Sequence, residues 1–254
     1  MSKNIVLFGE TGAGKSSVLN LLKGSEVAAV SDSAVGCTFE HTMYPIPPNY
    51  NVFDTAGLSE GSAGTVGADK AIEQLEKLLK QLSLTGGVNL LIFVAKFGRI
   101  TKTVEDNFNL FVKTICMNRV PVLLFLTNSE WEPNPRKWWE ENAQEYRNHG
   151  MIFGDSVVGC AANPDKYPAP VKPMIRERRK QSLKELTNLI ERHALQSAWR
   201  VVDPAAWLGS VVIAVIQILM AVSTFFFPTG SIVTVLGKLG LSSGLITSIV
   251  NMFK

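Results

Sequence analysis

Cysteine is scarce in this sequence: the 254 residues contain three, at Cys37, Cys116 and Cys160. The odd number and the wide spacing exclude a closed disulfide framework and a Cys-x-x-Cys zinc pattern, and they are typical of a reducing compartment. The N-terminus also lacks the long apolar run of a secretory signal peptide, because its apolar stretch, residues 5–8, has only the length of a strand. We therefore expect the bulk of the chain to stay in the cytosol.

Charge is low overall and nearly missing from one end of the chain. The formal net charge of +3 is too small to predict nucleic acid as a partner. Residues 171–200 hold eight Lys or Arg against three Glu, whereas residues 205–254 hold two lysines and no acidic residue. This contrast divides the chain into two expected parts, residues 1–200 and residues 201–254.

Short apolar runs alternate with longer amphipathic stretches along the first part. The alternation predicts an α/β fold, in which a mostly parallel sheet carries helices on both faces. Residues 42–46 are expected to add one antiparallel strand, paired with residues 51–53 through a Pro-Pro-Asn turn. Four prolines make residues 162–173 a loop. The expected strands are residues 5–8, 51–53, 88–94, 120–126 and 156–159, and the expected helices are residues 15–23, 69–82, 103–118, 136–148 and 174–199.

An eight-residue glycine-rich motif follows the first expected strand and opens the first expected helix. It matches Gly-x-x-x-x-Gly-Lys-Ser/Thr without a mismatch, in the context that a phosphate-binding loop requires. Its backbone N–H groups can converge on a β-phosphate at the positive end of the helix dipole. Lys15 is expected to act as the catalytic cation on the β- and γ-phosphates, and the Ser16 hydroxyl to ligate Mg²⁺. The motif comprises Gly9, Glu10, Thr11, Gly12, Ala13, Gly14, Lys15 and Ser16, and Ser17 is expected to join them at the nucleotide.

Two further groups fit a protein that senses the γ-phosphate. The run Asp-Thr-Ala-Gly at 54–57 follows a strand, so Asp54 can reach the metal, usually through water, and the Gly57 N–H can approach the γ-phosphate. A polar loop precedes this run, and a threonine there can ligate Mg²⁺ only while the γ-phosphate is present. Thr38 is the preferred catalytic switch residue, with Ser33 and Thr42 as alternatives.

Guanine selection normally needs a carboxylate after the fourth expected strand. The usual Asn-Lys-x-Asp motif is missing there, and the run Thr-Asn-Ser-Glu stands in its place. Glu130 is expected to accept hydrogen bonds from the base, with Asn128 or Thr127 in support; the alternative is a helix-capping turn. The run Asn-Pro-Asp-Lys at 163–166 has the wrong order and lies in the proline-rich loop, so we reject it as a base-reading motif. The backbone at residues 159–161 is better placed to contact the guanine ring.

The sequence also lacks a glutamine where one would orient the attacking water. Leu58 follows the Asp-Thr-Ala-Gly run, and its side chain cannot hold a water molecule. Intrinsic hydrolysis is therefore expected to be slow unless Ser59, Glu60, a second protomer or an activating partner supplies the missing group.

These features together resemble the immunity-associated GTPase family, which is related to septins and to chloroplast import GTPases. The resemblance covers about residues 3–199 and rests on Gly-Glu-Thr-Gly-Ala-Gly-Lys-Ser-Ser at 9–17, Asp-Thr-Ala-Gly-Leu at 54–58 and Lys-Phe-Gly-Arg-Ile-Thr at 96–101. It implies a P-loop GTPase G domain that binds GTP or GDP with Mg²⁺, turns over slowly and pairs as a nucleotide-dependent homodimer or oligomer. The chain departs from the family at the base-reading site, where relatives commonly have Thr-x-x-Asp. Many relatives also carry a C-terminal membrane anchor.

The second part of the chain is apolar enough to meet a membrane. Residues 205–227 form a run of 23 residues without a charge. As a helix this run would span roughly 34 Å, enough for a hydrocarbon core of ~30 Å. The basic stretch before it favours the cytoplasmic side, so the G domain is expected to face the cytosol with membrane lipid as a partner. Packing of this helix on the G domain is the alternative. Residues 231–253, interrupted by Lys238 and three glycines, suit an interfacial helix or a re-entrant hairpin.

The sequence thus predicts a membrane-tethered GTPase that switches or assembles. One alternative is a P-loop ATPase or kinase of another class, in which Glu130 is incidental. The other is a non-hydrolysing, nucleotide-bound membrane scaffold, in which Leu58 marks lost hydrolysis. Trp131, Trp138 and Trp139 lie on or near one expected helix. A Trp pair there is interpreted as packing against the sheet, and no function is assigned to it.

Overall fold

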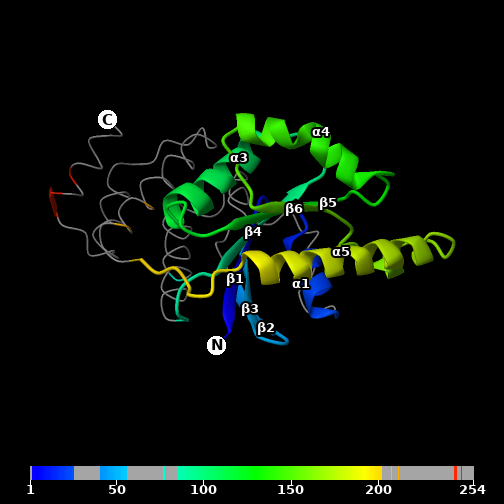
Figure 1. Ribbon diagram of the computed structural model, residues 1–254, viewed down its shortest axis with the longest axis horizontal. Helices are drawn as coiled ribbons and strands as arrows, with labels where there is room; N and C mark the ends of the chain where they lie inside the picture. Colours follow the sequence, from blue (N-terminus) through cyan, green and yellow to red (C-terminus); the bar gives the residue numbers. More distant parts are fainter. Residues whose placement is uncertain are drawn as a thin grey trace.

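A six-stranded sheet organises the part of the chain that the computed structural model describes, residues 2–25, 41–55, 77, 85–201, 207, 211, 243, 244 and 247. The strands lie in the order β2-β3-β1-β4-β5-β6 (Figure 1). β2 runs antiparallel to β3, and every other neighbouring pair is parallel, which confirms the expected mostly parallel sheet with its antiparallel addition. The strands are β1 Lys3–Phe8, β2 His41–Ile46, β3 Tyr50–Thr55, β4 Leu90–Lys96, β5 Val122–Thr127 and β6 Asp155–Val158.

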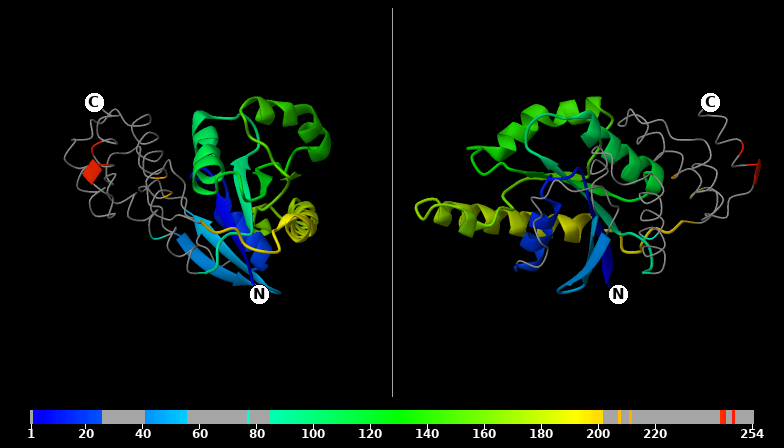
Figure 2. Two further views of the ribbon diagram at one scale, coloured as in Figure 1. Left: turned by 60° about the vertical axis from the view of Figure 1, so that its left-hand side comes forward. Right: turned by 180° about the vertical axis from the view of Figure 1, so that it is seen from behind.

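Helices cover both faces of this sheet. Two turned views show α3 and α4 on one side and α1 and α5 on the other (Figure 2). This arrangement confirms the three-layer α/β architecture that the alternating sequence pattern predicts. The helical segments are α1 Lys15–Lys23, α3 Lys102–Phe108, the π-helical η2 Asn109–Ile115, α4 Pro135–Asn148, the 3₁₀ turn η3 Pro164–Lys166 and α5 Lys172–His193.

The central strand β4 contributes side chains to the hydrophobic cluster on each face of the sheet. Leu91, Phe93 and Ala95 pack with the aromatic side chains of α3 and η2, whereas Leu90, Ile92 and Val94 pack with α1 and α5. Successive side chains of a strand point to opposite faces, so a strand buried on both faces must be apolar throughout. The seven-residue strand is buried except at its last residue, Lys96.

The last helix is shorter at its C-terminus than the sequence predicts. α5 ends at His193 instead of residue 199, because Ala194 is extended and the following backbone pairs with the residues just before β4. Trp199 N donates to Val88 O at 2.8 Å, and Val88 N donates to Trp199 O at 2.9 Å. Gly87 makes this approach possible, since a Cβ there would lie 2.2 Å from Trp199 O. The same contact holds Val88 outside β4, which begins two residues later than expected.

Two other helix boundaries differ from the expected ones by more than one residue. The helix expected to end at residue 118 ends earlier, because Met117 and Asn118 adopt left-handed backbone angles with φ of 51° and 54°. The proline-rich segment is not loop throughout: it contains η3, and α5 begins inside it at Lys172. Pro173 fits the first turn of α5, where backbone N–H groups have no partner within the helix.

Much of the C-terminal part lies outside the described residues, which include two positions of the 205–227 run. The Trp207 indole N–H donates to Ile115 O at 2.7 Å, and Val211 is buried in the cluster under α3 and η2. Within the described ranges no helix has the length and apolarity needed to cross a membrane. The expected spanning helix, the segment 231–253 and the helix expected at residues 69–82 therefore stay predictions.

Candidate nucleotide-binding site

The phosphate-binding loop joins β1 to α1 at the carboxyl edge of the sheet, and two glycines let it lie against neighbouring strands. Gly9 has φ of +147°, and a Cβ there would lie 2.0 Å from Val94 O. Gly14 caps α1 with φ of 95°, and its Cβ would lie 3.0 Å from Cγ2 of Thr127. A side chain at either position would push the loop off β4 or β5.

Lys15 brings a positive charge under this loop. Its side chain is buried, and Nζ donates to Gly9 O at 3.1 Å and to Glu10 O at 2.9 Å. The ammonium group therefore lies at the N-terminus of α1, where the helix dipole also favours an anion. Both contributions point to a phosphate group as the ligand of the loop.

Ser16 and Asp54, two of the three expected metal ligands, face each other. The Ser16 hydroxyl donates to Asp54 Oδ2 at 3.0 Å, across 38 residues of sequence. A hydroxyl and a carboxylate at this separation are the oxygen donors that Mg²⁺ prefers, so the pair fits that ion. Thr42, an alternative switch residue, pairs with Asp54 across the β2–β3 ladder. The preferred residue Thr38, together with Ser33, Gly57 and Leu58, lies outside the described residues.

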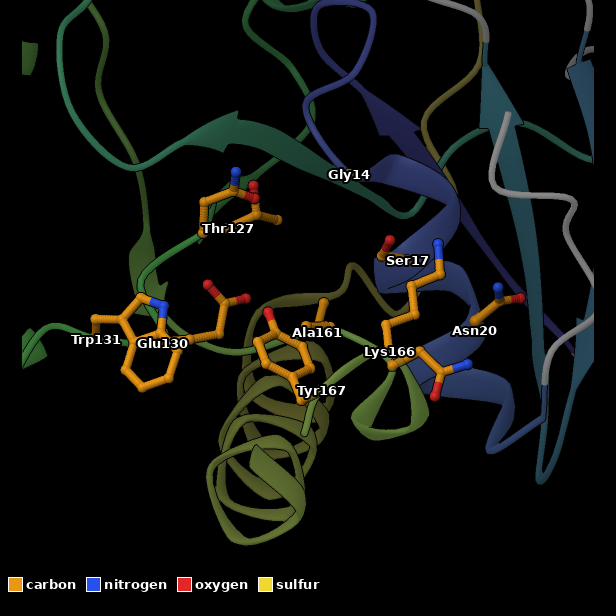
Figure 3. A pocket seen from close by; sticks show the side chains of 12 residues that line it. Gly14, Ser17, Asn20, Thr127, Glu130, Trp131, Ala161, Lys166 and Tyr167 are labelled. Carbon is orange, nitrogen blue, oxygen red and sulfur yellow. The ribbon is translucent and has the colours of Figure 1, made fainter. Parts of the chain in front are cut away.

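A pocket of about 520 Å³ opens beside the phosphate-binding loop (Figure 3). It lies between α1, the end of β5 and the segment around η3. The lining of the pocket includes three of the expected base-contacting residues, one residue of the phosphate-binding motif and Ser17, which follows the motif. The lining residues are Gly14, Ser17, Asn20, Thr127, Asn128, Glu130, Trp131, Ala161, Ala162, Asn163, Lys166 and Tyr167.

Hydrogen bonds join the turn after β5 to the phosphate-binding loop and to the residue that follows β6. The Thr127 hydroxyl donates to Ala13 O at 2.6 Å, and the Ser129 hydroxyl donates to Gly159 O at 2.9 Å. Asn128 is exposed and has φ of 61°, a conformation that Asn tolerates better than most residues. Capping of the next helix, the alternative interpretation of this turn, is wrong, because the Asn134 side chain caps α4.

Glu130 brings a carboxylate to the pocket. It is 7% exposed, and it makes no hydrogen bond or ion pair with the described residues. Figure 3 shows its carboxylate directed into the pocket beside Tyr167. Burial raises the pKa of the Tyr167 hydroxyl, and the negative charge of Glu130 raises it further. Burial likewise raises the pKa of the Cys160 thiol to about 11, with a smaller contribution from Glu130.

Comparison with known proteins places this geometry in a known fold. The family model described as "50S ribosome-binding GTPase" matches residues 4–128, slightly less than half of the chain. No curated protein matches the sequence. Era from Aquifex aeolicus, solved with GDP·AlF4−, is 14% identical with a TM-score of 0.51, over 80% of this chain and 60% of its own. The chain has a P-loop GTPase fold.

Two further solved structures with this GTPase fold are similar to the chain. Era in complex with MgGDPNP and part of 16S ribosomal RNA is 16% identical with a TM-score of 0.50, over 84% of this chain and 65% of its own. A dimerization-deficient variant of Toc33 from Arabidopsis thaliana is 17% identical with a TM-score of 0.44, over 72% of this chain and 85% of its own. At these identities the likeness to Era shows the fold alone.

Within this GTPase fold, the Lys-Phe-Gly-Arg-Ile-Thr box links β4 to α3 beside the phosphate-binding loop. Phe97 N donates to Thr127 O at 2.8 Å, and the Phe97 ring packs against Trp138 with centroids 4.3 Å apart. The Thr101 hydroxyl accepts from Val104 N and caps α3. Trp138 and Trp139 are partly buried against the core, which confirms their interpretation as packing residues.

Sequence reasoning missed one side of the pocket. Trp131 is 63% exposed and lines the pocket, and its ring centroid lies 6.3 Å from that of Tyr167. Lys166 belongs to the rejected Asn-Pro-Asp-Lys run but lines the pocket. Asp165 of that run pairs instead with Lys172 of α5, at 3.3 Å. An aromatic residue next to the expected base carboxylate was the available signal for Trp131.

Proposed function

We propose that the protein binds GTP and GDP with Mg²⁺ and hydrolyses GTP. The observation that carries this proposal is the buried Lys15 ammonium under the glycine loop, with the Ser16 hydroxyl and the Asp54 carboxylate 3.0 Å apart beside it. A cation, a helix N-terminus and a pair of oxygen donors together fit a nucleotide phosphate with its metal. The match of residues 4–128 to a GTPase family model supports guanine as the base.

Different residues of the site contact the phosphates and the metal. With nucleotide bound, Lys15 would exchange its contacts with the Gly9 and Glu10 carbonyls for β- and γ-phosphate oxygens, and Ser16 and Asp54 would hold the metal directly or through water. Bound Mg²⁺ neutralises charge on the phosphates. Thr38 remains the proposed switch residue. Thr42 suits switching less well, because its backbone is already held in the β2–β3 ladder, opposite Asp54.

Slow hydrolysis and pairing of G domains form the second part of the proposal. Leu58 stands where a water-orienting glutamine would be, so Ser59, Glu60, a second copy of the chain or a partner must supply that group. Single-turnover hydrolysis at rising protein concentration tests this. A self-activating dimer accelerates, whereas the non-hydrolysing scaffold stays flat.

Selection of guanine over adenine is assigned to Glu130. Glu130 is 7% exposed, its carboxylate is directed into the pocket, and it has no hydrogen-bond partner among the described residues, so base N–H groups could donate to it. An ATPase is the competing function. Chromatography of the nucleotide released from the purified full chain decides between them: GDP or GTP supports the proposal, and adenine nucleotide contradicts it.

We also propose that residues 201–254 attach the protein to a membrane and that the G domain, residues 1–200, faces the cytosol. It is supported by the uncharged 23-residue run and the basic stretch before it. Trp207 and Val211 contact the G domain, and a helix over the remaining residues 212–227 would measure about 24 Å, less than a hydrocarbon core of ~30 Å. Full spanning therefore requires the Trp207 contact to open; otherwise the segment lies in the interface.

We also propose that the chain is related to the immunity-associated GTPases. It is supported by the three sequence motifs at 9–17, 54–58 and 96–101. A nucleotide-dependent homodimer or oligomer is the property of that family that bears most on the mechanism, because it offers a source for the group missing at Leu58.

A further inference from the structure

The pocket beside the phosphate-binding loop has one aromatic wall. Trp131 follows the buried Glu130 directly, and Tyr167 follows η3, so two segments far apart in sequence place their rings at one side of the pocket (Figure 3). The ring planes are inclined by 58° with centroids 6.3 Å apart, so the rings form a corner and do not stack on each other. A planar ring laid against one of them meets the other at an angle, an arrangement that aromatic groups favour.

The position of this corner limits what can occupy it. Gly14 and Ser17 line the same pocket, so its occupant is continuous with the group held by the phosphate-binding loop. Glu130 lies beside Tyr167 closely enough for its charge to raise the pKa of the Tyr167 hydroxyl. The occupant must therefore be flat, carry N–H donors on one edge and be joined to phosphate. A purine nucleotide has all three properties.

The exposed indole of Trp131 gives a physical reason for a base to stack there. Trp131 is 63% exposed, among the largest exposures of a bulky apolar side chain in the described residues. Covering it with a base removes apolar surface from water, and base–aromatic stacking tolerates any base because every base has a π-face. Stacking on this wall thus adds affinity, whereas Glu130 adds selectivity.

We propose that Trp131 and Tyr167 form the stacking wall that holds the purine base of the bound nucleotide. This proposal rests on the proposed function and adds to it two binding residues that supply affinity for the base. Neither residue is needed for the phosphate contacts, which come from the opposite end of the pocket.

Calorimetric titration of the full-length protein with GDP and with inorganic tripolyphosphate tests the wall. Trp131→Ala and Tyr167→Ala should each weaken GDP binding about fivefold to 150-fold, the range that stacking energies imply, and leave tripolyphosphate binding within about twofold. Trp131→Phe keeps a ring and should retain most of the affinity. Ile152→Ala, which truncates an exposed apolar side chain outside the pocket, should change neither affinity.

Tryptophan fluorescence supplies a second readout. GDP should change the emission of the wild type and tripolyphosphate should not, and Trp131→Phe should lose most of the GDP response. Wild-type GDP affinity in both alanine variants, equal losses for GDP and tripolyphosphate, or an unchanged GDP response in Trp131→Phe would each overturn the wall while the proposed function stands. A wild type that binds no guanine nucleotide would overturn both.

Discussion

Close approaches between backbone segments decide which residues the phosphate-binding loop accepts. A Cβ on Gly9 would lie 2.0 Å from Val94 O, a fixed backbone atom at the centre of the sheet. Gly24, by contrast, ends α1 with φ of 72° and has nothing within 4 Å of its Cβ position. Both glycines have a positive φ, 147° at Gly9 and 72° at Gly24, and they differ in the room around them.

Gly9→Ala should therefore destabilise the fold far more than Gly24→Ala. The substitution at Gly24 meets only the left-handed backbone cost of about 1–2 kcal/mol, whereas the one at Gly9 adds overpacking and should cost about 2–5 kcal/mol. Chemical denaturation of the two variants measures the difference. Equal midpoints would mean that the loop does not lie against β4 as described.

Glu130→Gln should reduce discrimination between GTP and ATP about tenfold to a hundredfold. The variant keeps the shape of the side chain but replaces the charged acceptor of a hydrogen bond that is worth about 1.5–3 kcal/mol. Competition between the two nucleotides measures the ratio. Intact selectivity would remove Glu130 from base recognition. Glu132→Gln, two residues further on, is the control, since Glu132 lies outside the pocket lining.

Residues of the site differ in how far sequence reveals them. The phosphate-binding motif is contiguous, so its pattern predicts a loop between β1 and α1 where the structure has one. Trp131 and Tyr167 are separated by more than 30 residues, and only the fold brings them together. The run at 163–166 has the wrong order for a base-reading motif and lies in the proline-rich segment, and neither property reveals that Lys166 lines the pocket.

At the scale of elements, the end of β5 holds the phosphate-binding loop in place. The buried Thr127 hydroxyl donates to Ala13 O at 2.6 Å, and its methyl group closes on Gly14. A single side chain thus joins the turn after β5 to the start of α1. Nucleotide affinity should depend on this contact even though it does not touch phosphate.

Thr127→Val should lower stability by about 1–3 kcal/mol, because it preserves the methyl contact but leaves the Ala13 carbonyl without its donor. GDP affinity should fall as the loop loosens. Thermal unfolding and calorimetry of the same variant measure the two effects. Thr187→Val, on the partly exposed surface of α5, is the matched control. A variant as stable as this control, with unchanged GDP affinity, would show that the hydroxyl is not needed.

Local pattern predicts the elements better than their ends. Periodicity identifies β1, α1 and the antiparallel β2, because each is decided by its own residues. The end of α5 depends on a distant segment. Residues 194–199 could continue the helix, but Trp199 forms backbone hydrogen bonds with Val88 instead. The start of β4 shifts for the same reason. Long-range backbone pairing of this kind leaves no mark in the sequence window around either end.

For the whole molecule, the central question is how the apolar C-terminal part relates to the G domain. Trp207 donates to Ile115 O, and Val211 is buried with the side chains under η2, so the 205–227 run begins in contact with the domain. Composition predicts a membrane segment, and it gives no sign of this contact. A model of membrane attachment must explain both the apolar composition of this run and its contact with the G domain.

Truncation at Asp203 should release the protein from membranes and leave GTP binding intact. The full chain should stay in the membrane pellet after carbonate extraction if residues 205–227 span the bilayer, since a spanning helix resists release. Extraction by carbonate would favour interfacial attachment with Trp207 still in place. A full chain that is soluble before any extraction would contradict both forms of attachment.

The most direct test of the account is calorimetric titration of the nucleotide-free full chain with GTP in the presence of Mg²⁺, for the wild type and for Lys15→Ala. The substitution removes the cation under the glycine loop, whose charge-assisted contacts are worth roughly 1.5–3 kcal/mol. The account predicts that the wild type binds GTP and that affinity falls about tenfold to more than a hundredfold in the variant. Equal affinities, or a wild type that does not bind GTP, would contradict it.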